Sequence, residues 1–131
     1  MGKTPGPPSI VLDAGALIAL ERGDGRMRAL CREALQSRLQ LVIPAGVVAQ
    51  VARGGGHPHA LHALLASAAT EVPPLDRALA VAVGALCART GTTDVVDASV
   101  ALTARRLQAV VVSSDEGDLR RLDPSIRVEP I

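Results

Sequence analysis

The fold of this chain is decided by the stretch at residues 93–98, which reads TDVVDA. Its two acids, Asp94 and Asp97, stand three residues apart at the start of an apolar run with helical spacing. This spacing puts both carboxylates on one face of the first helical turn. An apolar, β-branched run follows at residues 110–113, and Asp115 comes shortly after it. The arrangement predicts a helix followed by a buried strand, with acids at the start of the helix and after the strand.

Short apolar strands and helix-like segments alternate along the rest of the chain. We expect strands at 9–12, 41–43, 71–73, 110–113 and 127–129, and helices at 14–21, around 27–35, and at 44–53, 59–68, 76–89, 94–107 and 116–122. This alternation predicts an α/β domain with a short-stranded, mainly parallel central sheet and helices on both faces. Ligands of such sheets bind at the carboxyl ends of the strands. Asp13 and Asp115 each follow a strand, so we expect both at the same edge.

Composition limits the class of protein. We expect one domain over residues 1–131, with residues 1–8 forming a disordered N-terminus. Hydrophobic residues make up 48% of the chain, but Phe, Tyr and Trp are absent, so the core must be aliphatic. The same absence removes the base-stacking platforms of OB-fold or RRM-type binders. The net charge of +1 predicts no broad basic surface for nucleic acid. Without a signal-peptide pattern or an apolar run of membrane length, we expect a cytoplasmic protein.

Helix capping is the competing explanation for each acid. Asp94 suits an N-cap and Asp97 the third helical position, while Asp13 and Asp115 could each cap the helix that follows. Separate caps do not explain why three distant segments share one arrangement. Carboxylates crowded together shift each other's pKa values unless a cation compensates. Because an all-oxygen ligand set suits Mg²⁺ or Mn²⁺ better than zinc, we expect a metal site formed by these four acids.

Three segments together resemble the PIN domain family, the Mg²⁺-dependent ribonuclease fold of VapC-type toxins in type II toxin–antitoxin pairs. The segments read VLDAGALIAL at 11–20, DVVDASVALTA at 94–104 and VVVSSD at 110–115, and the resemblance runs roughly from residue 9 to 128. It implies a three-layer α/β/α sandwich in which acids from separate segments hold one or two divalent ions.

The resemblance also implies roles for particular residues and partners. Asp13, Asp97 and Asp115 match the catalytic, metal-binding acids of the family, and Asp94 is an auxiliary acid and metal ligand beside Asp97. Bound Mg²⁺, or Mn²⁺, would polarise an RNA phosphodiester and lower the pKa of the attacking water. The implied partners are an RNA substrate, a cognate antitoxin that inserts a basic side chain among the acids, and a second copy in a homodimer. No membrane partner is expected.

The sequence departs from the family pattern at two positions. Gln50 stands where similar domains usually carry a Glu, so one negative charge is missing, which Asp94 could partly replace. Gly15 stands where a small hydroxyl residue often follows the first acid by two positions. The alternative function is therefore a catalytically weakened or inactive PIN-like module that binds RNA or protein.

Further polar residues are candidates for the site. Ser114 could bind a scissile phosphate or a metal-bound water, or it could satisfy the loop backbone. Arg53 follows Gln50 by three positions and suits either a phosphate contact or a solvated helix end. The pairs 105–106 and 120–121 are arginines that could line an RNA path. A third class, a phosphatase or a receiver-like domain phosphorylated on an aspartate, lacks its expected lysine, because the only lysine is Lys3.

Overall fold

The strands form one parallel sheet in the centre of the molecule. The computed structural model describes residues 8–56 and 58–131, and within them five strands lie in the order β3-β2-β1-β4-β5. The strands are β1 (Ser9–Leu12), β2 (Gln40–Val42), β3 (Thr70–Glu71), β4 (Val110–Ser113) and β5 (Val128–Pro130). All four neighbouring pairs are parallel. The prediction of a short-stranded parallel sheet is confirmed.

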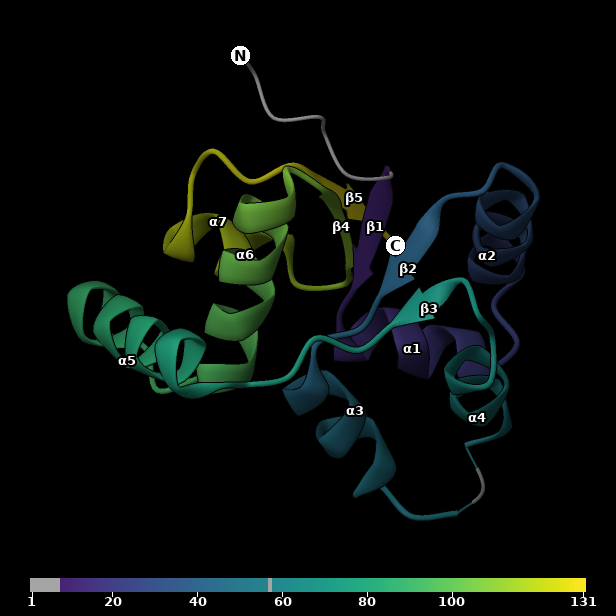
Figure 1. Cartoon of the computed structure of the whole chain (residues 1–131), viewed down its shortest axis with the longest axis horizontal. Helices are drawn as coiled ribbons and strands as arrows, with labels where there is room; N and C mark the ends of the chain where they lie inside the picture. Colours follow the sequence, from purple (N-terminus) through teal and green to yellow (C-terminus); the bar gives the residue numbers. More distant parts are fainter. Residues whose placement is uncertain (1–7, 57) are drawn as a thin grey trace.

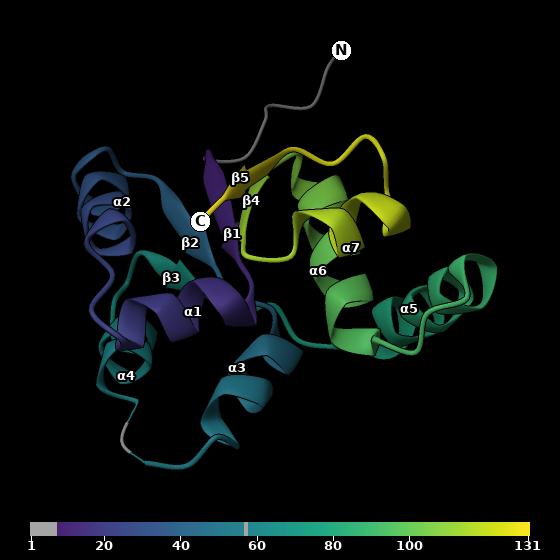
Figure 2. The same ribbon diagram turned by 180° about the vertical axis from the view of Figure 1, so that it is seen from behind.

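Helices cover both faces of this sheet. They are α1 (Ala14–Glu21), α2 (Gly25–Gln36), α3 (Ala45–Ala52), α4 (His59–Leu65), α5 (Arg77–Thr90), α6 (Val95–Leu107) and α7 (Glu116–Leu122). Figure 1 shows α1, α2 and α4 on one side of the sheet and α6 and α7 on the other, with α5 packed outward on α6. The view from behind gives the same division (Figure 2). The expected three-layer α/β/α sandwich is therefore confirmed.

Most element boundaries lie where the sequence predicts them, and the exceptions have local causes. The helix expected at 59–68 ends at Leu65, because the amide of Ser67 already turns back to the carbonyl of Leu64. Pro44 lies at the N-cap of α3, not within its first turn, because its ψ of 144° is extended. The segment of residues 1–8 that we expect to be disordered lies, apart from Pro8, outside the described residues. The carbonyl of Pro8 accepts a hydrogen bond from the amide of Gln40.

The core is aliphatic and lies on both faces of the central strands. Fully buried side chains come from β1, β2 and β4, as expected for parallel strands covered on both faces: Val11, Leu12, Leu41, Val42, Val111 and Val112. Two apolar side chains that continue the apolar spacing of their helices are exposed. Leu35 is 43% exposed because α2 buries only the narrower stripe of Met27, Cys31 and Ala34. Ala82 is exposed because α5 rests mainly on α6 through Val83, Leu86 and Cys87.

No helix in the described residues is by itself long and apolar enough to cross a membrane. Within residues 8–56 and 58–131, one pair of helices, α5 and α6 with a 110° bend between them, reaches the necessary length and composition when taken together.

Candidate acidic site at the carboxyl edge of the sheet

Asp13 joins the end of β1 to the start of α1. It is only 3% exposed, and both of its carboxylate oxygens accept hydrogen bonds. Oδ1 accepts from the amide of Ala16 at 2.9 Å, which makes Asp13 the N-cap of α1. Oδ2 accepts from the hydroxyl of Ser113 at 2.5 Å. The first acid is therefore held both by its own helix and by the neighbouring strand β4.

Ser113 is a site residue that the sequence reasoning missed. Its side chain is fully buried at the end of β4. While its hydroxyl donates to Asp13, its Oγ accepts the amide of Asp115 at 2.8 Å. One side chain thus fixes the first acid and the backbone of the last. The available signal was a serine at the end of a buried apolar strand, because a buried hydroxyl requires a hydrogen-bond partner.

Asp94 and Asp97 open α6, as the sequence predicts. The side chain of Asp94 accepts the amide of Asp97 at 2.9 Å, so its capping role is confirmed. Asp97 does not cap the helix. Burial raises the pKa of Asp97 to about 7, with further increases from the charge of Asp94, a hydrogen bond with its side chain, and the charges of Asp115 and Asp13. The charges of the other three acids therefore all act on Asp97 at this edge of the sheet.

Asp115 stands at the N-cap position of α7 but does not cap it. Its side chain makes no capping hydrogen bond, and the residue is exposed. Its amide is held by Ser113, so the backbone is fixed while the carboxylate stays uncommitted. Capping therefore accounts for Asp94 and for one oxygen of Asp13, but not for Asp97 or Asp115.

The charge of the four acids is not neutralised by a basic side chain in the described part of the chain. The ion pairs found there join Arg26 to Glu129, Arg120 to Glu116 and Arg121 to Asp118. Burial raises the pKa of Asp13, and the charge of Asp115 adds to this, against the hydrogen bonds from Ser113 and Ala16. Crowded anions of this kind are stabilised by a cation.

The donor set fits a hard divalent cation, because carboxylate oxygens are the ligands that Mg²⁺ and Mn²⁺ prefer. The carboxylates do not, however, stand in a ready coordination geometry. Across residues 8–56 and 58–131, no three His, Cys, Asp or Glu side chains converge closely enough to coordinate one ion as they stand. An ion held by three of these acids would have to draw their side chains inward.

Helix α3 lies beside the acidic turn. A Cβ at Gly46 would come 3.5 Å from Cγ2 of Val96, which belongs to the first turn of α6. Gln50 lies one turn further along the same face of α3 and is half-buried. Arg53 is exposed at the C-cap of α3. The structure therefore places Gln50 on the side of α3 that faces the first turn of α6, and Arg53 at the end of α3.

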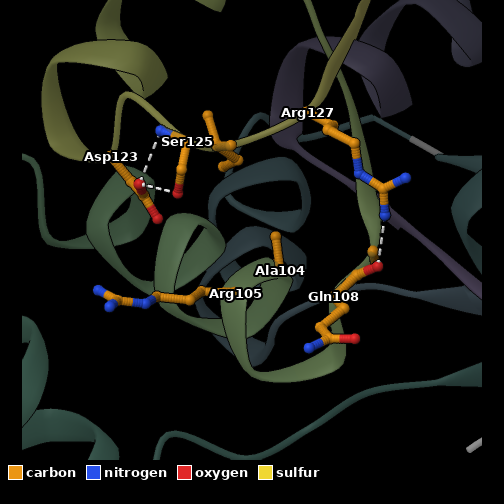
Figure 3. A pocket seen from close by; sticks show the side chains of 8 residues that line it. Ala104, Arg105, Gln108, Asp123, Ser125 and Arg127 are labelled. Atoms are coloured by element: carbon orange, nitrogen blue, oxygen red, sulfur yellow. Dashed lines mark hydrogen bonds between the residues drawn. The ribbon is translucent and has the colours of Figure 1, made fainter. Parts of the chain in front are cut away.

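Two cavities flank α6, one at each end of the helix. The cavity at the acidic end has a volume of about 230 Å³ and is lined by Thr90, Gly91, Thr92, Asp94, Asp97, Asp118, Arg121 and Leu122. The cavity at the other end, about 280 Å³, is lined by Ala104, Arg105, Gln108, Ala109, Asp123, Ser125, Ile126 and Arg127 (Figure 3). Only the smaller cavity contains members of the acidic cluster.

Comparisons with known structures agree with this architecture. VapBC2 from Rickettsia felis, solved bound to a DNA fragment from its promoter, matches with a TM-score of 0.70 and 13% identity, covering 94% of this chain and 98% of the other. FitAB bound to the IR36 DNA fragment matches with a TM-score of 0.62 and 19% identity, covering 92% of this chain and 94% of the other. PAE2754 from Pyrobaculum aerophilum matches with a TM-score of 0.62 and 23% identity, covering 92% of this chain and 83% of the other. At these identities the likeness establishes the fold.

The sequence itself establishes the family. No curated protein sequence matches the chain. By contrast, the model of the family described as "PIN domain" matches residues 10–124, a span that includes all four acids together with Ser113 and Ser114. The chain therefore belongs to the PIN domain family, whose members are generally nucleases.

Proposed function

We propose that this protein is a Mg²⁺- or Mn²⁺-dependent endoribonuclease and the toxin of a VapC-type toxin–antitoxin pair. The observation that carries the proposal is the cluster of four carboxyl groups at the carboxyl edge of the sheet, which no described basic side chain pairs with and whose mutual repulsion helps raise the pKa of Asp97 to about 7. A cluster of this kind gains from binding a divalent cation, and such cations work with phosphate substrates.

The proposed mechanism assigns each acid a task. A bound divalent cation would polarise the phosphodiester and lower the pKa of the attacking water. Asp13 and Asp115, which are tied together through Ser113, would fix the ligand position at the strand ends. Asp97 would complete the ligand set from α6, where a bound cation would favour its ionised form. Asp94 would orient the first turn of α6 and add charge.

The cavity beside Asp97 supports a path for RNA. Arg121 of α7 lines this cavity together with the acid pair and Thr92, whose hydroxyl accepts the amide of Asp94 and can still donate its own proton. An arginine and hydroxyl groups are suitable partners for phosphate oxygens. Arg53 on α3 would contact a phosphate from another side of the acids. We therefore propose that the RNA backbone crosses the acidic edge between α3 and α7.

The partners of the proposed toxin are an antitoxin and a second copy of the chain. The similar structures named VapBC2 and FitAB are complexes with DNA fragments, which favours an antitoxin partner that itself contacts DNA. A homodimer is supported by exposed apolar residues around the projecting helix α5, where Val81 is 69% exposed. The proposed location is the cytoplasm.

The experiment that tests the proposal is cleavage of structured RNA with Mg²⁺ and with EDTA. The matched control is Asp76→Asn, because it makes the same substitution at an acid outside the cluster, and asparagine keeps the cap that Asp76 provides to α5. Wild type and Asp76→Asn should cleave only with Mg²⁺, and Asp97→Asn should not cleave. Cleavage that persists in EDTA, or equal cleavage by Asp97→Asn, would count against a metal-dependent nuclease.

Gln50 favours a second candidate, a PIN module that binds RNA or protein without cleaving it. The amide removes a charge from the side of α3 that faces the first turn of α6. Calorimetric titration with Mn²⁺ separates the two functions. A protein that binds RNA but no Mn²⁺ would support the binding module and exclude the nuclease.

A further inference from the structure

Gly15 and Ser114 compete for one position beside Asp13. Gly15 is the second residue of α1 and has no side chain. A Cβ built on it would overlap Oγ of Ser114 and would lie 3.1 Å from Cβ of Ser114 and 3.5 Å from Oδ1 of Asp13. The hydroxyl of Ser114 therefore occupies the volume that a side chain at position 15 would need.

The Ser114 hydroxyl is also uncommitted. It forms no hydrogen bond with any other described residue, so it does not satisfy the loop backbone. Its neighbour Ser113 differs, because that hydroxyl is fully buried and takes part in two hydrogen bonds. Since Ser114 is exposed, its hydroxyl can contact a ligand that approaches Asp13.

We infer that Ser114 is a positioning residue of the acidic site, whose hydroxyl occupies the space left by Gly15 and orients an oxygen ligand at Asp13. The oxygen would belong to a metal-bound water or to a phosphate, so the inference rests on the proposed function. The two consecutive serines then have different roles. Ser113 fixes Asp13 and the backbone of Asp115, and Ser114 contacts the ligand. The hydroxyl that the first turn of α1 lacks is supplied by the loop after β4.

A double-mutant cycle tests this assignment with the full chain. The variants are Ser114→Ala, Ser114→Gly, Gly15→Ser and the double variant Gly15→Ser/Ser114→Gly. Each is measured by thermal unfolding in EDTA and by calorimetric titration with Mn²⁺. Ser37→Ala is the matched control, because Ser37 is an exposed serine at the end of α2.

Ser114→Ala should leave the midpoint of unfolding in EDTA unchanged and should lower Mn²⁺ affinity about tenfold, as loss of a group that orients metal ligands does. Gly15→Ser alone should displace the Ser114 hydroxyl, which ends an exposed side chain, and should lower Mn²⁺ affinity, with only a small fall in the midpoint of unfolding. The double variant should regain most of the Mn²⁺ affinity, since the new hydroxyl at position 15 replaces the old one. Ser37→Ala should match wild type in both measurements.

Additive single effects would overturn the inference, because two residues that compete for one position must be coupled. Unchanged Mn²⁺ affinity in Ser114→Ala would also overturn it, while Mn²⁺ binding by wild type would leave the proposed function standing. If wild type binds no Mn²⁺, the proposed function and the ligand role of Ser114 fall together. The measurements in EDTA would then still show whether the two positions compete.

Discussion

The carboxyl ends of the strands form one edge of the sheet, and their amino ends form the other, which we call the amino edge. Both edges carry acidic side chains, but the pKa values of these acids are shifted in opposite directions. At the carboxyl edge, Asp13 and Asp97 have raised pKa values, and the acids there lack a cationic partner among the described residues. At the amino edge, hydrogen bonds from Ser125 lower the pKa of Asp123, with help from the charge of Arg105. There, too, the guanidinium of Arg127 donates to the carbonyl of Gln108 at 2.7 Å (Figure 3).

This difference teaches that cavity volume is a poor guide to where a cation would be favoured. The cavity at the amino edge is the larger, at about 280 Å³ against 230 Å³. Asp123 and Arg127 already have hydrogen-bond partners there, so a ligand that bound them would have to break hydrogen bonds that the fold uses. At the carboxyl edge a cation would relieve repulsion that the fold leaves in place. Functional potential lies where the electrostatics of the folded chain are unfavourable.

The largest expected effect is the response of each edge to a divalent cation. Mn²⁺ at 100 times its dissociation constant should raise the free energy of unfolding of wild type by about 2.7 kcal/mol. Asp97→Asn should lose most of this gain, and Asp123→Asn should keep it. Chemical denaturation with and without Mn²⁺ measures the difference. If both variants lose the gain equally, the distinction between the edges is wrong.

The second effect is the pH dependence of stability in EDTA. The folded chain holds a proton on Asp97 up to about pH 7, whereas the unfolded chain releases it near 3.8. Because the folded state binds more protons in this window, the free energy of unfolding should fall as pH rises from about 4 to about 7. Allowing for solvent screening, the loss should be on the order of 1 kcal/mol. Denaturation curves at several pH values should show a flatter profile for Asp97→Asn.

At the amino edge, the contribution of Asp123 to the free energy of unfolding should depend on pH with the opposite sign. The folded-state pKa of Asp123 lies below its ordinary value of 3.8. Its contribution to stability is therefore present above that value and is lost as the pH falls below it. A pH profile of Asp123→Asn that matched the profile of Asp97→Asn would contradict the assignment of opposite shifts.

A smaller effect separates two caps with the same local geometry. Asp94 accepts an amide at 2.9 Å and Asp76 at 2.8 Å, and loss of either cap should cost about 1 kcal/mol of stability. Asp94→Ala also removes a charge beside Asp97, which offsets part of that cost. In EDTA at pH 8, Asp94→Ala should therefore destabilise less than Asp76→Ala, and at pH 5 the two should converge. Equal costs at both pH values would show that Asp94 is a cap alone.

The smallest effect is expected at α3. Gln50→Glu adds a carboxylate to the helix face toward the first turn of α6 and should raise Mn²⁺ affinity roughly three- to fivefold, which corresponds to about 1 kcal/mol or less. Gln36→Glu, at the exposed end of α2, is the matched control and should leave Mn²⁺ affinity unchanged. Calorimetry that found the two variants alike would remove Gln50 from the site.

Much of the fold follows from local patterns in the sequence. The bounds of β1, α1, β4 and α7 agree with the prediction residue for residue, because in each case an apolar run leads to an acid that separates strand from helix. The exposure of Leu35 and Ala82 does not follow from such patterns. The number of apolar side chains that a helix buries depends on the surface against which it packs, and that surface belongs to other parts of the chain.

The candidate site divides in the same way. The meeting of Asp13 and Asp115 at one edge was predictable, because strands that run parallel place the residues after them together. Asp97 was joined to them by the acid pattern and by the resemblance to the PIN domain family. The bond between Ser113 and Asp13 and the competition between Gly15 and Ser114 were not predictable. Both depend on the close approach of α1 and the end of β4 in three dimensions.

The hydrogen bond between Ser113 and Asp13 has a consequence for the order in which the chain folds. Its two residues lie 100 positions apart, and closing a loop of that length costs about 4 kcal/mol of chain entropy. The other three acids belong to one continuous segment formed by α6 and β4. Three acids can therefore assemble locally, whereas the fourth joins only when β1 pairs with β4. A chain still emerging from the ribosome would carry no complete acidic site until its sheet had closed.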